Sequence, residues 1–152
     1  MRLTRLEVRE VLDLYIRAWV EQDPDLIVTI FTDAATYHER VLGTPIRGRE
    51  GIREYWQSKV VESQGAIECE LLNLYVDGNT AIAEWEAHFD DLVQGVRKRM
   101  REVAILVFEG GLIASLREYW ASERVPGLNR DGVGSGRAAE APDGSVGDLH
   151  TV

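Results

Sequence analysis

Apolar side chains recur with helical spacing near the start of the chain. Five of them fall at i, i+3, i+4, i+7 and i+11, which is one stripe of a helix: Val8, Val11, Leu12, Tyr15 and Trp19. Thr4, followed three residues later by Glu7, forms a capping box at the helix start. The pattern therefore predicts an amphipathic helix that begins after Thr4 and ends near Gln22.

Two more helices and one strand are predicted between residues 23 and 61. Asp23 is a favourable N-cap and Pro24 suits the first helical position, so we expect a short helix up to about Phe31. A strand follows at about 34 to 40. The segment GREGIREYWQSKVV then spaces four apolar residues along one helical face: Ile52, Tyr55, Trp56 and Val60.

The rest of the pattern is strand-like. Four such segments lie near 66–76, 80–91, 97–108 and 112–122. DGN at 77–79 and EGG at 109–111 are hairpin turns, and Gly95 marks a third. The order of elements predicts an α+β fold, a cone-shaped curved antiparallel sheet packed on three N-terminal helices, with a pocket inside.

The segment VAILVF at 103–108 is apolar at every position. A strand of this kind is typically covered on both of its faces. One face would meet the helices, and we expect the other to meet a second subunit in a homodimer.

Composition narrows the class of partner. Apolar residues make up 45% of the chain, charged residues 28%, and the formal net charge is −9. Such a charge disfavours nucleic acid and anionic membranes and leaves small neutral or cationic ligands open. With a single cysteine, Cys69, no basic and apolar leader and no long apolar run, the sequence favours a cytoplasmic protein without disulfides.

The chain divides near residue 124. Residues 1–124 carry the periodic pattern and are expected to form one domain. Residues 125–152 are rich in glycine and proline and lack an apolar period, which predicts a flexible tail.

Four stretches resemble a known superfamily: YIRAWVEQDPDLIVTIFTDAATYHE, PIRGREGIREYW, DGNTAIAEWEA and GGLIASLREYW. Together they are similar to the nuclear transport factor 2-like superfamily, and within it to SnoaL-like and ketosteroid isomerase-like proteins, over about residues 8 to 124. The resemblance implies a cystatin-like α+β roll around a small-molecule pocket. It leaves the activity open, because this fold hosts isomerases, cyclases, dehydratases, epoxide hydrolases and noncatalytic binders.

The resemblance also implies roles for individual residues. The hydrogen-bonding tyrosine of the isomerase matches Tyr15, and its catalytic carboxylate matches Glu39. The place of its protonated acid falls on Ala104, which has no proton to donate. Glu102, two residues earlier and on the same strand face, is the candidate replacement, since burial in an apolar pocket would keep its carboxyl protonated.

Glu118 is a further inward candidate whose orientation depends on the turn before it. A three-residue EGG loop that pairs Phe108 with Leu112 would put Glu118 on the face of Glu102, whereas a two-residue loop would put it on the opposite face. Aromatic and apolar residues are expected to wall the pocket: Trp19, Tyr37, Tyr55, Trp56, Trp85, Ala104, Leu116 and Trp120. Trp85 and Ala87 stand where the related epoxide hydrolases have an arginine and an aspartate.

Glu39 has two interpretations. Strand alternation would turn Tyr37 and Glu39 inward and His38 outward. An inward carboxylate either works as a base or is paired with an arginine such as Arg47 or Arg101. An arginine near both Glu39 and Glu118 would favour pairing, and a free Glu39 would favour catalysis.

The charged run EWEAHFDD places Glu84, Glu86, His88 and Asp90 on one strand face. The neighbouring strand offers Arg97, Lys98, Arg99 and Arg101, so cross-strand ion pairs explain the run better than a metal site. No metal or other cofactor is expected.

The leading hypothesis is an enzyme that uses acid–base chemistry on a small hydrophobic carbonyl or related substrate. The alternative is a noncatalytic ligand-binding or dimerisation module of the same family.

Overall fold

The first helix begins where the capping box predicts. In the computed structural model, which describes residues 2–127, α1 spans Arg5–Val20. The Glu7 N–H donates to Thr4 Oγ1 at 3.1 Å, and the Thr4 N–H donates to Glu7 Oε1 at 2.8 Å. The helix ends two residues before the expected Gln22.

The second helix is shorter than predicted and the first strand begins earlier. Asp23 Oδ1 accepts hydrogen bonds from the N–H groups of Asp25 and Leu26, and α2 spans Pro24–Val28. Strand β1 spans Phe31–His38 rather than 34–40. The reason is sheet pairing, because the Ile113 N–H donates to the Ile30 carbonyl at 2.8 Å and Phe31 pairs with Ile113.

The third predicted helix is two structures in succession. Helix α3 spans Gly48–Tyr55, and the chain continues as a π-helix, η1, over Trp56–Val61. A two-residue strand that the pattern does not signal, β2 at Ile46–Arg47, precedes α3 and pairs antiparallel with β1.

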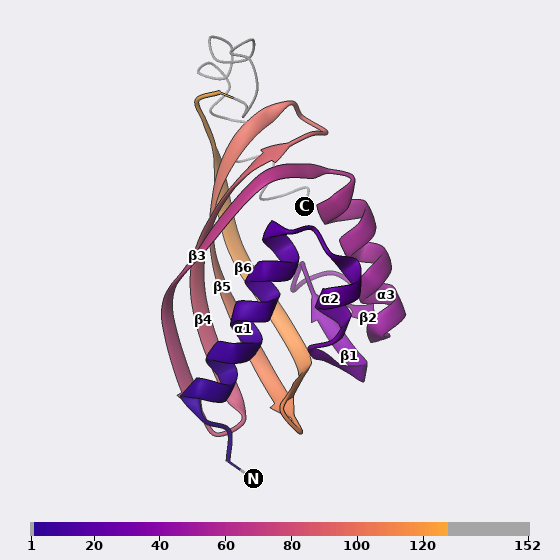
Figure 1. The fold of residues 1–152 in the computed structure, drawn as a ribbon, viewed down its shortest axis with the longest axis vertical. Helices are drawn as coiled ribbons and strands as arrows, with labels where there is room; N and C mark the ends of the chain where they lie inside the picture. The colour runs from indigo at the N-terminus through magenta and orange to yellow at the C-terminus, as the bar shows by residue number, and fades with distance from the viewer. Residues whose placement is uncertain (1, 128–152) are drawn as a thin grey trace.

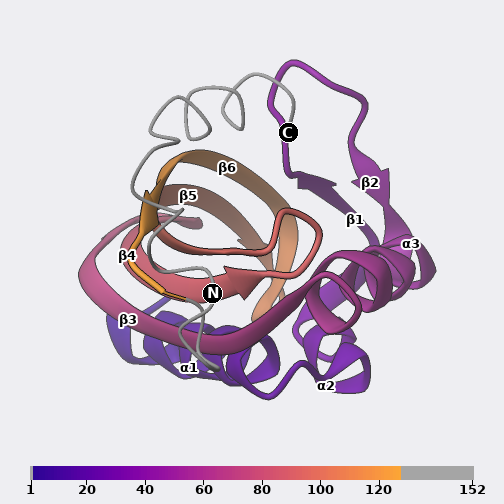
Figure 2. The same cartoon turned by 90° about the horizontal axis from the view of Figure 1, so that it is seen from above.

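The sheet has six strands in the order β2-β1-β6-β5-β4-β3. The four long strands are β3 (Gln64–Asp77), β4 (Thr80–Asp91), β5 (Val96–Glu109) and β6 (Leu112–Val125). They form the predicted meander, while β1 lies parallel to β6, so the sheet is mixed. The predicted α+β class is confirmed. The long strands curl around α1, and α2 and α3 lie beside it (Figures 1 and 2).

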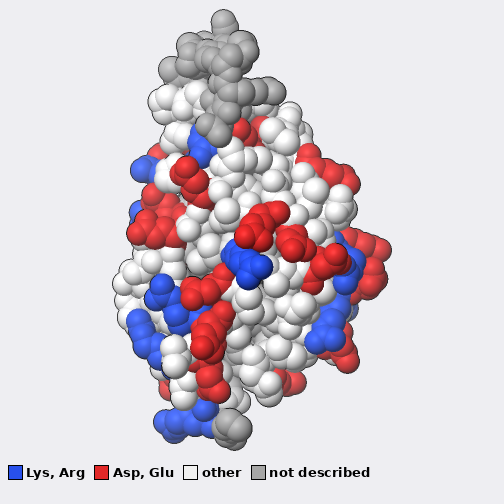
Figure 3. Space-filling view, in the orientation of Figure 1, with Lys and Arg blue, Asp and Glu red and all other residues white. Residues whose placement is uncertain are grey.

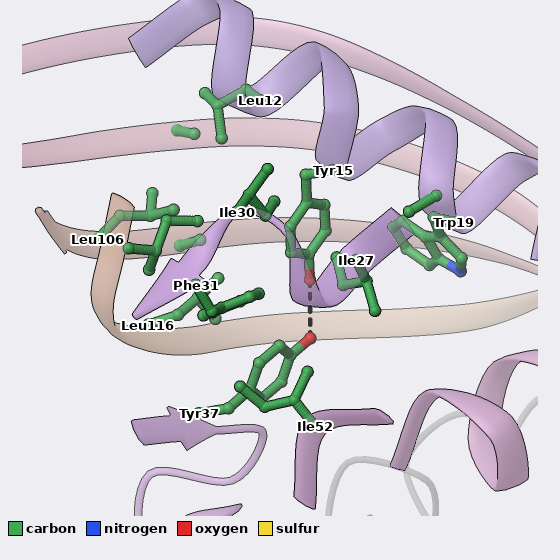
Figure 4. Packing of buried hydrophobic residues seen from close by; sticks show 14 of the residues in the cluster. Leu12, Tyr15, Trp19, Ile27, Ile30, Phe31, Tyr37, Ile52, Leu106 and Leu116 are labelled. Carbon is green, nitrogen blue, oxygen red and sulfur yellow. Dashed lines mark hydrogen bonds between the residues drawn. The ribbon is translucent and has the colours of Figure 1, made fainter. Parts of the chain in front are cut away.

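The core fills the space between the concave face of the sheet and the helices. Leu12 from α1, Phe31 from β1, Leu106 from β5 and Leu116 from β6 are completely buried there. In Figure 4 these apolar side chains gather on one side of Tyr15, and Trp19 lies on the other. The cone is thus packed solid at one end.

A β-bulge in β6 decides which way Glu118 faces. The turn has two residues, Gly110 and Gly111, and pairs Glu109 with Leu112. By itself this turn would send Glu118 to the outer face. The register shifts between Val107 and Phe108, so that β6 gains one residue and Ala104 pairs with Glu118. Glu118 therefore shares the concave face with Glu102. The cause is the bulge, which neither the two-residue nor the three-residue loop alternative included.

The convex face carries the charged runs. Arg101 pairs with Glu84 at 3.4 Å and also with Glu86, and Arg97 pairs with Asp90 at 3.0 Å, as cross-strand pairing predicts. Lys98 is the exception, because strand alternation turns it to the concave face, where it is buried. On the helix-covered side, which is the side drawn in Figure 3, acidic and basic side chains are also interspersed.

Two further expectations concern the C-terminal boundary of the domain and the presence of a membrane-spanning helix. Strand β6 continues to Val125, just past the expected boundary at 124, and the rest of the predicted tail lies outside the described residues from 128 onward. Between residues 2 and 127, no helix is both long and apolar enough to cross a membrane.

We propose that the convex face of the sheet forms a homodimer interface. Val103, Ile105 and Val107 are half-buried there, and Ile82 and Tyr119 beside them are 39% and 45% exposed. Ile105→Glu should put a charge into this interface and shift the protein from dimer to monomer in multi-angle light scattering at micromolar concentration. Leu6→Glu, at a residue of α1 that is 68% exposed, is the matched control and should leave the dimer intact. A wild-type monomer would rule the interface out.

Candidate functional site

A cavity of about 250 Å³ opens between the concave sheet face, α1 and the α3–η1 segment. Aromatic side chains form much of its wall, and titratable groups lie at two levels within it. Its deeper residues include Tyr15, Tyr37, Tyr55, Trp56, Glu102 and Glu118. Its more exposed residues include Glu39, Arg40, Lys59, Val93 and Gln94.

Two tyrosines bind one carboxylate oxygen at the centre of the site. Tyr37 donates its hydroxyl hydrogen to Glu118 Oε2 at 2.7 Å, and Tyr15 donates to the same oxygen at 3.1 Å. The two hydroxyl oxygens lie 2.7 Å apart. Figure 4 shows the tyrosines meeting tip to tip from α1 and β1. All three side chains are buried.

Glu102 and Glu118 form a carboxyl pair on neighbouring strands. Glu118 lies directly across from Ala104, so these two acids flank the position at which the resemblance places an acid. Burial raises the pKa of Glu102 well above its ordinary value, and the negative charge and hydrogen bond of Glu118 raise it further. Burial also raises the pKa of Glu118, to about 7, although hydrogen bonds from Glu102, Tyr37 and Tyr15 oppose that rise. At neutral pH the pair therefore holds one proton firmly and a second one loosely.

The three tyrosines stay protonated. Burial, followed by the negative charge of Glu118, raises the pKa of Tyr15, Tyr37 and Tyr55 well above 10. They are hydrogen-bond donors at every physiological pH. A carboxylate that receives such donors is held in one orientation.

Two polar atoms beside the pair lack protein partners. Glu102 Oε2 and Trp85 Nε1 are buried and form no hydrogen bond with the described residues. Trp85 on β4 is the cross-strand neighbour of Glu102 on β5. The nearby indole N–H lowers the pKa of Glu102, against the larger effect of burial. Because Glu102 borders the cavity, a rotation of its carboxyl group would bring this unsatisfied oxygen to a ligand.

The π-helix supplies one wall. An extra residue per turn in η1 alters which side chains face the sheet, and Trp56, Lys59 and Val60 all border the cavity. The Trp56 indole N–H donates to the Ala18 carbonyl at 3.1 Å, which ties η1 to α1. Tyr15 packs edge-on against Trp56, with ring centroids 5.6 Å apart.

Glu39 takes no part in the hydrogen bonds between Tyr15, Tyr37 and Glu118, although its carboxylate helps to raise the pKa of Tyr55. It follows β1, borders the cavity, and is 17% exposed, with its two oxygens 3.8 Å from Arg40 and 3.7 Å from Lys59. The expected partners Arg47 and Arg101 are wrong, because Arg101 pairs with Glu84 and Glu86 on the convex face. Tyr37 points inward and is 2% exposed, whereas His38 is half-buried.

Most predicted wall residues border the cavity, and three do not. Trp19, Tyr37, Tyr55, Trp56 and Trp120 line it. Trp85 lies behind Tyr15, whose ring stacks on it at 5.0 Å. Ala104 and Leu116 are completely buried in the packed core and have no cavity surface.

The sequence pattern did not identify several residues that line the cavity. Gln64 accepts a hydrogen bond from the Trp19 indole at 2.9 Å, and Lys59 and Arg40 approach Glu39. The charged run predicted that Lys98 lies on the convex face. It lies on the concave face instead, where its Nζ is 3.0 Å from Asp91 Oδ2. Its position in the strand alternation, in phase with Glu102, was the signal that identifies it as inward-facing.

The arrangement is suited to proton transfer. It combines a firmly protonated carboxyl, a carboxyl whose pKa lies near 7, and fixed donors in an apolar cavity. Among residues 2–127 no group of three or more histidine, cysteine, aspartate or glutamate side chains is arranged to hold a metal ion.

The raised pKa of Glu118 makes stability depend on pH. The folded state keeps its proton up to a pKa of about 7, whereas the unfolded chain releases it near 4.5, so the contribution to stability is present at low pH and lost as pH rises through 7. Relative to Glu118→Gln, the wild type should lose up to about 3 kcal/mol of unfolding free energy between pH 5 and pH 8.5. Urea unfolding across this range measures the difference. Glu54→Gln, at an exposed position of α3, should follow the wild-type profile, and parallel profiles for wild type and Glu118→Gln would contradict the assignment.

Comparisons with known proteins agree on the fold. The sequence profile of the SnoaL-like domain matches residues 12–116. No curated protein matches the sequence. A ketosteroid isomerase-like protein from Catenulispora acidiphila, solved with trimethylamine, is similar with a TM-score of 0.64 and 20% identity over 72% of this chain and 84% of that one.

Two structures of enzymes are also similar. SalBIII, an epoxide hydrolase/cyclase-like enzyme in pyran ring formation of the polyether salinomycin, is 27% identical, with a TM-score of 0.65 over 74% of this chain and 88% of that one. An LEH-like epoxide hydrolase from M. tuberculosis is 17% identical, with a TM-score of 0.64 over 76% and 83% of the two chains.

The family profile covers more than half of the chain, and the solved neighbours share its fold. The predicted resemblance is thereby confirmed: the protein belongs to the SnoaL-like family of the nuclear transport factor 2-like superfamily.

Proposed function

We propose that the protein is an enzyme that moves protons on a small hydrophobic carbonyl compound, with Glu118 as the base and Glu102 as the acid. The observation that supports this proposal is the buried carboxyl pair, in which one group is ionised near neutral pH while its neighbour stays protonated. Two buried acids with separated pKa values are the arrangement that allows one to accept a proton while the other donates.

The proposed step balances within the pair. Glu118 takes a proton from the carbon next to the carbonyl group, and Glu102 gives its proton to the carbonyl oxygen, which forms an enol. When Glu118 returns the proton to a different carbon and Glu102 takes back the enol proton, the product is an isomer. When the proton on Glu118 exchanges with solvent before it returns to the same carbon, the product is the starting ketone with a solvent hydrogen at that carbon. Tyr15 and Tyr37 hold Glu118 in place, and the unsatisfied oxygen of Glu102 would bind the substrate oxygen once the carboxyl group turns toward the cavity.

Glu118 is favoured over Glu39 as the base. Glu39 is shared by two cations and lies at the more exposed level of the cavity, so its negative charge is already compensated. In contrast, Glu118 receives only neutral donors from Tyr15 and Tyr37. Burial also raises the pKa of Glu118 to about 7, which suits a base that works at neutral pH.

Ring closure onto an epoxide is a second candidate, favoured by the 27% identity to SalBIII. In this reaction Glu118 would take the proton of a substrate hydroxyl, whose oxygen attacks an epoxide carbon as the C–O bond breaks and Glu102 protonates the leaving oxygen. The roles of the two acids are unchanged. Only the substrate differs.

A deuterium-exchange assay tests the carbonyl proposal. Cyclic ketones that raise the melting temperature in a thermal-shift screen are incubated with the protein in D2O, and exchange at the carbon beside the carbonyl is followed by NMR. Glu118→Gln should lower the exchange rate by about 10²-fold or more, because the amide cannot accept the proton. Tyr37→Phe should lower it by about tenfold or more and keep the fold, since it removes one oriented donor. Binding without exchange would favour the noncatalytic alternative.

Glu39→Gln separates the two candidate bases. If Glu118 is the base, this variant should keep exchange within a few-fold of wild type, and its unfolding free energy should change by about 1 kcal/mol or less, because its partners are partly exposed and beyond hydrogen-bond distance. Urea unfolding and the exchange assay measure both effects. A 10²-fold loss in Glu39→Gln together with an active Glu118→Gln would assign the base to Glu39.

A further inference from the structure

Positive side chains gather around the more exposed part of the cavity. Arg40 and Lys59 stand on one wall, at the end of β1 and on η1, and Lys98 stands on the sheet. Lys98 is only 4% exposed although its side chain is charged. In a protein with a net charge of −9, three cations around one opening are unexpected.

Another cation, Arg124, lies directly beside Lys98. Arg124 on β6 is its cross-strand partner, so both side chains lie on the concave face. Like charges in this relation repel each other. Arg124 Nε is also buried and makes no hydrogen bond with the described residues. The pair therefore combines electrostatic repulsion with an unsatisfied buried donor on Arg124, and an anion bound at Lys98 relieves the repulsion.

The carboxylates at this level do not balance the cations. Of the ionic residues that line it, Arg40 and Lys59 are positive and share one carboxylate, that of Glu39, whereas Lys98 pairs with Asp91. Glu39 is divided between Arg40 and Lys59 at 3.8 and 3.7 Å, longer than hydrogen bonds. Both cations thus have N–H groups to offer to a ligand.

The deeper level has the opposite character. Glu102 and Glu118 supply its charge and proton donor, and no arginine or lysine among the described residues hydrogen-bonds to either. Lys98 and Glu102 are four residues apart on β5, which separates the two levels by about 13 Å along the strand.

We propose that the opening binds a carboxylate of the ligand, so that the substrate is an organic acid whose opposite, neutral end reaches Glu102 and Glu118. Lys98 anchors the carboxylate from the sheet, with Arg124 beside it. Lys59 and Arg40 close over it from the other wall. The inference rests on the proposed function only for the chemistry at the neutral end.

A matched pair of probes tests the carboxylate without any turnover. The affinities of 3-(4-oxocyclohexyl)propanoate and of its methyl ester are measured by isothermal titration calorimetry at 50 and 500 mM salt. The acid should bind at least about tenfold more tightly than the ester at low salt, and this preference should shrink at high salt. Equal affinities, a preference for the ester, or no binding of the acid at millimolar concentration would overturn the proposal.

Variants assign the preference to residues. Lys59→Gln and Arg40→Gln should each reduce the acid-over-ester ratio by a few-fold, and Lys98→Met should reduce it most. Lys98→Met removes a partner of Asp91, so the fold of this variant is checked by circular dichroism. If Lys98→Met unfolds, the double variant Lys59→Gln/Arg40→Gln decides. Arg17→Gln removes the same charge from an exposed position of α1 and should keep the wild-type ratio. A wild-type ratio in the double variant would overturn the proposal, whereas acid binding without deuterium exchange would count against the proposed reaction alone.

Discussion

One carboxylate oxygen, Glu118 Oε2, joins three parts of the chain that are far apart in sequence. It accepts hydrogen bonds from Tyr15 on α1 and from Tyr37 on β1, while Glu118 itself lies on β6. Each hydroxyl is buried, so each needs this acceptor as much as the carboxylate needs the donors. The fold brings α1, β1 and β6 together around an apolar core, and the two hydrogen bonds fix their relative positions.

Such a cluster is an expensive way to stabilise a domain. Burying two carboxyl groups side by side opposes folding through desolvation and mutual repulsion, and their raised pKa values express this opposition. Apolar residues of similar size would pack in the same space without either penalty. The energetic disadvantage is explained if the pair performs chemistry, because the same desolvation brings one pKa close to neutrality.

Sequence periodicity predicted the elements well because apolar spacing and capping are local properties. The capping box of Thr4 and the cap of Asp23 depend on residues three positions away, and both formed. The orientation of Glu118 depends instead on a bulge in β6, and the pattern of apolar residues gave no sign of that extra residue. The π-helix and the two-residue β2 escaped for a related reason, since each is decided by packing against neighbouring elements.

The residues of the candidate site follow from the sequence, whereas their roles stay predictions. Tyr15, Glu39, Glu102 and Glu118 all border the cavity; the resemblance points to Glu39 as the base, and the hydrogen bonds centre on Glu118. Two carboxyl groups nevertheless lie next to Ala104, because its cross-strand partner is Glu118 and Glu102 lies two residues before it. Positions on neighbouring strands of a sheet can thus present side chains to the same point.

The alternation of β5 explains how one strand serves both levels of the cavity. Its inward positions run from Lys98 through Met100 and Glu102 to Ala104 and Leu106, from a cation through a carboxyl to packed apolar side chains. Because the cone narrows in that direction, polar groups have room only toward the open end, where a ligand can satisfy them. Lys98 and Glu102 are therefore about 13 Å apart along the strand, a separation that the regular backbone of β5 keeps fixed. A ligand with one charged and one neutral end would reach from one residue to the other.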